Sequence, residues 1–341
     1  MAKAKKKKSR LPFIILLSIA GLFFFVIFKV FGPNTGKQRF LYVKTGTAYA
    51  QLLQQLKDSN YVKDTWSFNL LAQQWKLPEN IHAGKYLVKR GMSNFELVKK
   101  LRYGRQTPVR IVINKLRTEK DFIALMGENL EIDAGKLNDM LHQPAYMAEF
   151  GLDTNTVMCA VIPDTYEFYW NTTCDKAFRK IQKNYTRFWT DERKKQAKKH
   201  GLTPPQATII SSIIEEETNK SEDKPKIASV YLNRLDKGMK LQADPTVKFS
   251  IGDFSIKRVT GQMLQTQSRY NTYQNTGLPP GPICTPSPAT IEAVLQAPKT
   301  NFIYFCAKAD LSGASVFAST AEEHIKNAHA YQQALNARGI H

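Results

Sequence analysis

Cysteine and histidine are scarce in this chain of 341 residues, which contains four cysteines and six histidines. The cysteines are not paired at metal-ligand spacing and the histidines form no cluster, so we predict no metal and no cofactor. Outside the cytoplasm Cys159, Cys174, Cys284 and Cys306 could form disulfides. They could equally be free buried thiols, and the spacing does not decide between these alternatives.

Acidic residues are also few, with 29 aspartates and glutamates against 49 lysines and arginines and a formal net charge of +20. Such an excess favours acidic partners, among them nucleic acid, anionic lipid headgroups and acidic wall polymers. We detect no internal repeat, and the only low-complexity segment is the basic N-terminal tail. The basic run at 191–200 has few apolar positions and is interpreted as a solvated helix face.

One long apolar segment follows the basic tail at 1–10. Residues 11–28 carry no charge, and a helix over 11–31 would be roughly 30 Å long, enough to cross a bilayer core. A cleaved signal peptide would need a shorter apolar region and a small-residue cleavage site, which is missing here. We predict that residues 11–31 form a retained single-pass helix in the inner (cytoplasmic) membrane. The N-terminus would lie in the cytoplasm and the C-terminal bulk of the chain outside it, with a linker at 32–36. This location argues against nucleic acid as a partner.

Two domains are expected beyond the linker. Residues 37–115 read as a small module of mixed α and β structure, with strands at 40–43, 85–89 and 108–113. Its helices are predicted after the N-cap Thr47, at 66–75, and from a capping box at 93–96. Residues 116–341 read as a larger α+β domain. Its helices are expected at 119–130, 134–141, 176–189, 204–217, 226–237 and 290–296 and from a capping box at 320–323, with strands at 302–306 and 315–317.

Glu215 is the leading catalytic candidate. It closes an apolar run at 207–214 and is followed by Glu216, Glu217 and Thr218. Apolar neighbours disfavour the charged form of a carboxyl group, so we expect a raised pKa and a possible role as general acid. The alternative is a core helix that turns polar at its exposed end. On a helix the next two glutamates point about 100° and 200° away from Glu215.

Polar residues interleaved with apolar ones mark a second group of candidates. Asn233, Gln242, Asp244 and Thr246 could bond to sugar hydroxyls, although residues 244–246 could be only a turn. Tyr270 and Tyr273 could stack on a sugar ring, although a buried core tyrosine is the commoner fate. The proline-rich segment 276–288 predicts a rigid loop.

Six motifs in a fixed order resemble the YceG-like (MltG) endolytic murein transglycosylase family. They are Ser-Ile-Ile-Glu-Glu-Glu-Thr at 212–218, Asn-Arg-Leu at 233–235, Leu-Gln-Ala-Asp-Pro-Thr at 241–246, Tyr-Asn-Thr-Tyr at 270–273, Gly-Leu-Pro-Pro-Gly-Pro at 277–282, and Val-Phe-Ala-Ser-Thr-Ala-Glu-Glu-His at 316–324. Residues 83–88 also resemble the LysM-like module of that family. The resemblance covers nearly the whole chain and implies a LysM-like module at 37–115 and a YceG-like catalytic domain at 116–341.

The resemblance implies cleavage of the bond between N-acetylmuramic acid and N-acetylglucosamine in nascent glycan strands, leaving 1,6-anhydro ends. Glu215 would serve as the single general acid and base, with Glu217 tuning its pKa. Asn233, Gln242, Asp244, Thr246, Asn271 and Tyr273 would support it or bind substrate. The implied partners are peptidoglycan glycan strands, the lipid bilayer through 11–31, and penicillin-binding proteins or glycan polymerases.

Two segments depart from the family pattern. Met158-Cys159-Ala160 precedes Pro163-Asp-Thr-Tyr166 where the family usually has Glu-Gly, and residues 114–116 replace its Pro-Glu-Gly. These departures support the alternative of a membrane-anchored wall-binding scaffold without activity. Glu323 is expected to complete a capping box, and the role of His324 is left open.

Overall fold

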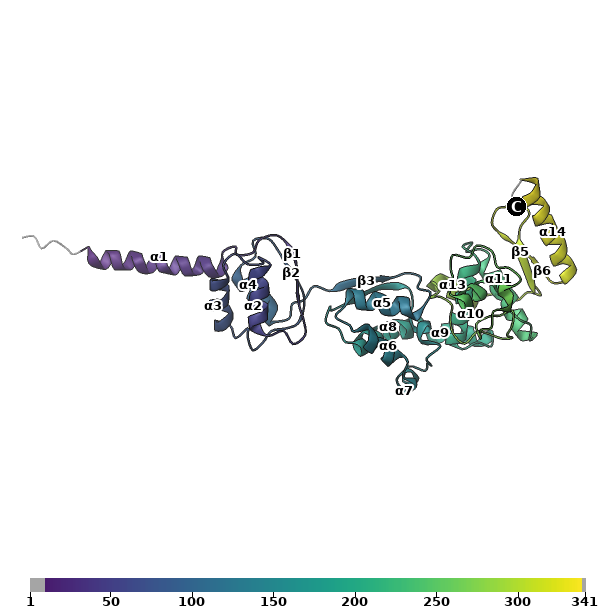
Figure 1. The fold of residues 1–341 in the computed structure, drawn as a ribbon, viewed down its shortest axis with the longest axis horizontal. Coiled ribbons are helices and arrows are strands. Elements are labelled where there is room, and N and C mark those ends of the chain that lie inside the picture. The colour runs from purple at the N-terminus through teal and green to yellow at the C-terminus, as the bar shows by residue number, and fades with distance from the viewer. Residues whose placement is uncertain (1–9, 339–341) are drawn as a thin grey trace, which may run out of the picture. The chain divides into compact units, whose positions relative to one another are not determined.

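The structure is a computed structural model that describes residues 10–338. The chain divides into two compact units (Figure 1). The first comprises residues 1–109 together with 129–131 and 167–172, and the second comprises 110–128, 132–166 and 173–341.

The first unit holds an apolar helix and a small mixed module. Its elements are α1 (Leu11–Phe31), β1 (Arg39–Val43), α2 (Tyr49–Asp58), α3 (Thr65–Gln74), β2 (Gly84–Val88) and α4 (Asn94–Arg102). Strands β1 and β2 are antiparallel, with Leu41 opposite Tyr86, and both of these side chains are fully buried. The core they enter also receives Leu52 and Leu56 from α2 and Phe68 from α3.

Local capping fixes where these helices begin. The predicted capping box of α4 is confirmed, because the Ser93 hydroxyl accepts from the Glu96 amide and the Glu96 carboxylate accepts from the Ser93 amide. The predicted N-cap of α2 is wrong. Ala48 occupies that position and the Thr47 hydroxyl donates instead to the Lys44 carbonyl at 2.7 Å.

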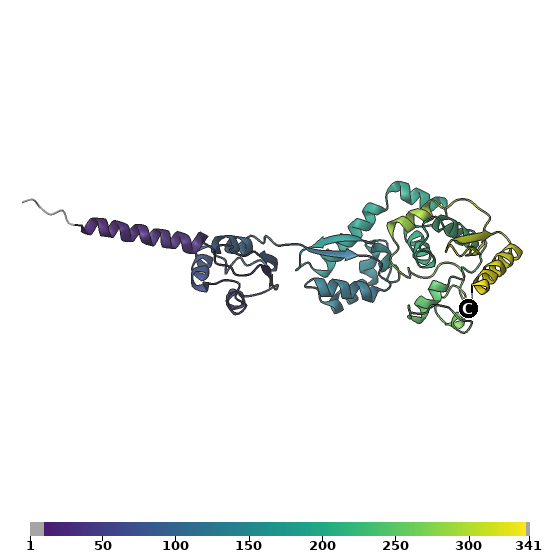
Figure 2. The same cartoon turned by 90° about the horizontal axis from the view of Figure 1, so that it is seen from above.

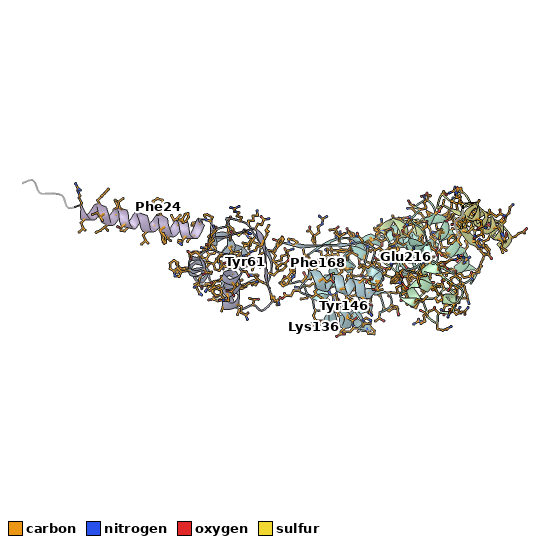
Figure 3. All side chains as sticks on the ribbon, turned by 45° about the horizontal axis from the view of Figure 1, so that its top comes forward. Phe24, Tyr61, Lys136, Tyr146, Phe168 and Glu216 are labelled. Atoms are coloured by element: carbon orange, nitrogen blue, oxygen red, sulfur yellow. The ribbon has the colours of Figure 1, made fainter. Side chains whose placement is uncertain are left out.

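Helix α1 contains a candidate membrane span, Phe13–Phe31, none of which is buried. Its side chains, Phe24 among them, stand away from the helix without cover (Figure 3). The C-terminal end of α1 packs against α3 and α4. There Lys29 forms an ion pair with Asp64 at 2.5 Å, and the Asn94 amide donates to the Lys29 carbonyl at 2.8 Å. The helix is therefore joined to the module by polar contacts as well as by apolar packing.

From residue 109 onward the chain is mostly helical. Its elements are β3 (Val109–Ile113), α5 (Glu119–Asn129), α6 (Ala134–Leu141), α7 (Pro144–Ala148), β4 (Asp164–Phe168), α8 (Cys174–Phe188), α9 (Asp191–Lys199), α10 (Pro204–Glu217), α11 (Lys224–Asp236), α12 (Asp244–Ile251), α13 (Pro288–Leu295), β5 (Tyr304–Ala307), β6 (Ser315–Ala318) and α14 (Ala321–Ala337), with short 3₁₀ turns at Val157–Ala160 and Met263–Gln265. Strand β3 pairs with β4, and β5 pairs with β6.

Helix α10 lies at the centre of the second unit. It packs on α11, α12 and α13, and the three helices α10, α11 and α13 lie side by side in both views (Figures 1 and 2). Residues 207–214 of α10 are all buried, which explains the apolar run in the sequence. The β5–β6 hairpin packs against α14 and contacts α11.

The fold agrees with the expected mixed α and β class, being mostly helical with two-stranded sheets and an N-terminal apolar helix. Some local predictions are wrong. Residues 244–246 do not form an isolated turn but open helix α12, and strand β4 and helix α7 were not predicted. Of the capping box at 320–323, only the Thr320 half is present, because the Glu323 carboxylate accepts from the Ser319 amide. All four cysteines are free thiols.

Candidate functional site

Helix α10 delivers three consecutive carboxyl groups at its C-terminal end. It begins at a capping box of Thr203 and Gln206, with prolines in the first turn, and ends at the C-cap Thr218. The C-terminal end of a helix carries partial negative charge, which disfavours ionised carboxylates. Each of the three glutamates therefore either has hydrogen bonds or cations that stabilise its ionised form, or keeps its proton to a higher pH than an ordinary glutamate.

Glu215 is held in an ion pair inside the unit. Its Oε2 atom accepts from Lys224 Nζ at 2.9 Å, from Ser287 Oγ at 3.1 Å and from the Thr290 hydroxyl. The side chains of Glu215 and Lys224 are only 16% and 13% exposed. These contacts join α10 to α11 and α13.

The expected rise in the pKa of Glu215 is wrong. Burial is the largest single cause and raises the pKa. Three hydrogen bonds, from Thr290, Lys224 and Ser287, and the positive charge of Lys224 together lower it by more, so the net pKa lies below its ordinary value. A carboxyl group with a lowered pKa is ionised near neutrality, which is unfavourable for donating a proton.

Glu216, labelled in Figure 3, points to a different pair of cations. Its carboxylate lies 2.7 Å from Lys115 Nζ and 3.3 Å from Arg117 Nη2. Both basic side chains are about a third or more exposed, so this is a rim ion pair.

Glu217 has the opposite surroundings from Glu215. Burial, with a smaller contribution from the charge of Asp244, raises its pKa from 4.5 to about 7, even though the Tyr231 hydroxyl bond and the charges of Lys248 and Arg234 act to lower it. The Tyr231 hydroxyl donates to Glu217 Oε1 at 2.6 Å. A carboxyl group in this state is partly protonated near neutrality and can donate its proton.

Glu217 opens into a polar and aromatic pocket of about 350 Å³. The lining residues are Glu217, Tyr231, Arg234, Leu241, Gln242, Asp244, Tyr273, Tyr304, Phe305 and His324. They come from α10, α11, α12, β5, α14 and two loops. This volume falls within the range of roughly 300–1,000 Å³ common for small-molecule sites, and aromatic faces beside hydrogen-bonding groups suit a saccharide ring.

Three of the sequence-predicted residues line this pocket beside Glu217. The Tyr273 hydroxyl donates to Asp244 Oδ1 at 2.7 Å. Asp244 lies in the first turn of α12, where the helix dipole favours a negative charge. Gln242 adopts a positive φ of 50°, uncommon outside glycine, and its amide donates to the Thr272 carbonyl at 3.1 Å.

Three other predicted residues do not line the pocket. The Asn233 amide donates to the carbonyls of Thr300 and Phe302, both at 2.8 Å. Thr246 is fully buried, and its hydroxyl lies 2.7 Å from the Ala243 carbonyl and 2.9 Å from the Thr272 hydroxyl. These two residues hold loops in place.

Asn271 is likewise fully buried, and it positions Tyr273. Its amide group donates to the carbonyls of Leu264 and Thr266 at 3.0 and 2.8 Å. Its Oδ1 atom accepts from the Tyr273 amide at 3.0 Å. Of the predicted sugar-stacking tyrosines, only Tyr273 reaches the pocket, because Tyr270 packs against Phe249 with ring centroids 4.8 Å apart.

The sequence argument missed two residues of α11. Tyr231 and Arg234 lie three positions apart and therefore share a helix face, whereas Asn233 points elsewhere. Arg234 is 8% exposed and donates to the carbonyls of Ile303 and Leu241, both at 2.7 Å. Helical periodicity through the Asn-Arg-Leu motif could have selected Arg234 over Asn233.

The C-terminal hairpin and helix complete one wall of the pocket. The ring of Tyr304 stacks on His324 at a centroid distance of 5.0 Å and an interplanar angle of 15°. Burial and the charge of Arg234 lower the pKa of His324, so its ring is neutral at pH 7. His324 Nδ1 is buried without a hydrogen-bond partner among residues 10–338.

A protonatable carboxyl group inside a pocket with polar and aromatic walls is one arrangement that enzymes use for acid catalysis on carbohydrates. Comparison with known proteins narrows this class. Residues 41–330 match the model of the YceG-like family. The chain therefore belongs to the YceG-like family.

Individual relatives agree with this assignment. The chain is 28% identical over 311 residues to an endolytic murein transglycosylase of Bacillus subtilis, covering 87% of this chain and 85% of that protein. An endolytic murein transglycosylase of Streptococcus pneumoniae is 24% identical over 357 residues, covering 94% of this chain and 64% of that protein. A crystal structure of a YceG-like protein from Listeria monocytogenes superposes with a TM-score of 0.54 and 26% identity, covering 86% of this chain and 99% of that one.

Proposed function

We propose that this protein is a membrane-anchored endolytic murein transglycosylase that cleaves the bond between N-acetylmuramic acid and N-acetylglucosamine in nascent strands. We assign the general acid and base to Glu217. The observation that carries this assignment is that Glu217 lines a pocket of about 350 Å³, and burial there raises its pKa, which favours the protonated form. The names of the relatives supply the substrate class.

The proposed reaction uses one carboxyl group twice. Protonated Glu217 donates its proton to the glycosidic oxygen, and the bond from that oxygen to the muramic anomeric carbon breaks. Glu217, now a carboxylate, takes the proton from the muramic 6-hydroxyl while that oxygen bonds to the anomeric carbon. The leaving sugar keeps the first proton, a 1,6-anhydro ring forms, and Glu217 is again protonated. No water is consumed, and the intramolecular attack benefits from proximity.

The neighbouring side chains support these steps. Tyr231 donates to Glu217 Oε1 and fixes the orientation of the carboxyl group. Asp244, held by Tyr273, lies on the same pocket and can stabilise the positive charge that develops on the sugar ring. Gln242 and Arg234 supply donors for sugar oxygens.

The competing assignment is Glu215, the candidate favoured by the sequence motif. Its Oε2 atom accepts from Lys224, Ser287 and Thr290, and Glu215 does not line the pocket of about 350 Å³. We therefore propose a positioning role for Glu215, through the placement of the last turn of α10.

A product assay tests both assignments. Full-length protein in detergent is incubated with uncrosslinked glycan strands, and the new ends are identified by mass spectrometry. We expect 1,6-anhydro ends from the wild type, from Glu215→Gln at a moderately reduced rate, and from Glu217→Gln only at a far lower rate. Activity lost in Glu215→Gln and kept in Glu217→Gln would reverse the assignment, and ends carrying added water would indicate a hydrolase.

The second candidate function is a non-catalytic wall-binding scaffold, favoured by the departures at 158–160 and 114–116. It predicts strand binding by the wild type with no new ends of either kind. The same assay therefore separates the two functions. Penicillin-binding proteins or glycan polymerases remain proposed partners, consistent with action on nascent strands.

Retention of α1 as a single-pass anchor is also a proposal. Cleavage behind α1 would remove the Lys29–Asp64 ion pair and the Asn94 bond, both of which join α1 to the folded module. A signal peptide is removed from the mature protein, so its residues are not expected to form hydrogen bonds and ion pairs with the folded module. This supports a chain whose N-terminus stays in the cytoplasm and whose second unit works outside.

A further inference from the structure

Helix α3 is apolar on two opposite faces. Phe68 and Ala72 enter the core of the first unit and are fully buried. On the outward side Trp66 is 65% exposed and Leu70 is 55% exposed, and these two lie four positions apart on one face. A second apolar face on a helix is normally covered by apolar material of its own. The outward face of α3 is therefore left largely uncovered by the described residues.

The exposed face of α3 borders a groove formed with α1. This groove has a volume of about 260 Å³ and is lined by Phe25, Val26, Lys29, Val30, Trp66, Ser67, Leu70, Leu71 and Gln74. The α1 residues among them belong to the candidate membrane span Phe13–Phe31. Because α1 and α3 share the groove, the medium that surrounds the C-terminal part of the span also contacts Trp66 and Leu70.

The position of the groove along α1 sets its depth. From Phe25 to Phe31 the helix rises roughly 9 Å at about 1.5 Å per residue, so the groove occupies the last third of a span that is close to the thickness of a bilayer core. Tryptophan is enriched at this level, where its ring meets hydrocarbon and its N–H meets water.

Charge at the same level is compensated. Lys29 is the one charged residue of the span, and its ammonium group pairs with Asp64, the N-cap of α3. A paired lysine near the end of a span is tolerated where an isolated charge is costly. The ion pair thus allows α3 to lie against lipid without exposing a bare charge to it.

We propose that the outward face of α3, formed by Trp66 and Leu70 together with the groove beside α1, is a lipid-binding surface in the extracytoplasmic interface of the bilayer. The occupant is bilayer phospholipid, because the wall of the groove is the membrane span itself. The module then lies on the membrane instead of standing above it. This inference rests on the proposed anchor and is independent of the proposed chemistry.

Quenching of tryptophan fluorescence by brominated lipid tests the proposal. Full-length protein is reconstituted into phosphatidylcholine vesicles with and without brominated acyl chains. The tested variant is Trp66→Phe. The matched control is Trp170→Phe, because Trp170 packs on Tyr42 of β1, and β1 lies across the first unit from α3 (Figure 1). Both variants keep three tryptophans of the original four.

We expect brominated lipid to quench the wild type and Trp170→Phe alike, and Trp66→Phe to lose most of that quenching. Bromine near the headgroup should quench more strongly than bromine near the chain end. Equal quenching of wild type and Trp66→Phe overturns the proposal. An absence of quenching in wild-type protein that floats with the vesicles also overturns it, because water or another protein would then cover α3. Failure to float would instead refute the anchor, whereas loss of activity alone bears only on the proposed function.

Discussion

Two glutamates on opposite sides of the last turn of α10, Glu215 and Glu217, have opposite environments. Glu215 faces a lysine and two hydroxyl donors, and its pKa is lowered. Glu217, two residues later, faces a pocket with one phenol donor, and its pKa is raised to about 7. Both carboxyl groups are partly buried. Deeper burial is the main cause of the raised pKa of Glu217, whereas at Glu215 the hydrogen bonds and the charge of Lys224 outweigh a smaller effect of burial.

The largest expected effect comes from removing the acid on the pocket side. Glu217→Gln should lower the rate of anhydro-end formation by roughly 10²–10⁴-fold, the usual contribution of a general acid and base. Because the amide is isosteric with the protonated acid, the thermal unfolding midpoint should not fall. Mass spectrometry of the products and calorimetry of the same sample measure the two effects. Wild-type activity in Glu217→Gln would show that Glu217 is not the general acid and base.

On the opposite side, the expected loss is one of stability. Glu215→Gln leaves the Lys224 ammonium unpaired, and we expect a loss of about 2 kcal/mol, below the roughly 3–5 kcal/mol of a fully buried pair. Urea denaturation of the second unit's transition measures it. The double variant Glu215→Gln with Lys224→Met is the control and should recover part of the loss. An unchanged midpoint in Glu215→Gln would mean that the ion pair contributes nothing.

The pH dependence of stability should carry opposite signs for the two acids. Glu217 has a raised pKa, so the folded state holds its proton more tightly, and its contribution to stability declines as pH rises from about 4.5 to about 7. Wild type should therefore lose on the order of 1–3 kcal/mol relative to Glu217→Gln across that window. Glu215 has a lowered pKa, so its contribution is present above about 4.5 and is lost as pH falls. Denaturation curves at several pH values test both signs.

Tyr231→Phe sharpens the comparison at the level of a single hydrogen bond. The Tyr231 hydroxyl lowers the pKa of Glu217, so its removal should raise that pKa by about one unit. Activity that depends on protonated Glu217 should then persist to higher pH. The measurement is the alkaline limb of the pH profile of kcat/KM. An alkaline limb that does not move would show that Tyr231 does not tune this acid.

The smallest expected effect concerns the bond between Tyr273 and Asp244. Tyr273→Phe removes one donor to Asp244 Oδ1 and keeps the aromatic face. We expect a loss of about 5-fold in kcat/KM, corresponding to about 1 kcal/mol for one hydrogen bond. Steady-state kinetics on defined glycan strands measure it, with Tyr270→Phe as the control because Tyr270 lies outside the pocket lining. An equal loss in both variants would indicate a general packing effect.

Sequence patterns predicted most of the elements that carry strong local signals. The capping box at Ser93, the apolar run at 207–214 and the membrane-length helix all appear in the structure. These features depend on neighbours within one turn of the chain, which a sequence displays directly. Strand β4 and the helix opening at Asp244 were missed, because partners distant in sequence stabilise them.

The site was predicted less completely for the same reason. The motifs led to Gln242, Asp244, Tyr273 and Glu217, all of which line the pocket. They ranked Glu215 above Glu217, and the order proposed here is the reverse, because Lys224, Ser287 and Thr290 reach one carboxyl group and not the other. Tyr304 and Phe305 reach the pocket only through the pairing of β5 with β6 and their packing near α11.

The polar joint between α1 and its module has a mechanical consequence. The Asn34 amide donates to the Asn94 side chain at 2.6 Å and to the Asp64 carbonyl at 2.9 Å, and Asp64 in turn holds Lys29. With these bonds in place, α1 cannot swivel on the module as a flexible tether would. A thinner bilayer makes an apolar helix tilt to hide its length. With α1 as the proposed anchor, such a tilt would rotate the module of the first unit by the same angle, so the orientation of that module would depend on membrane thickness.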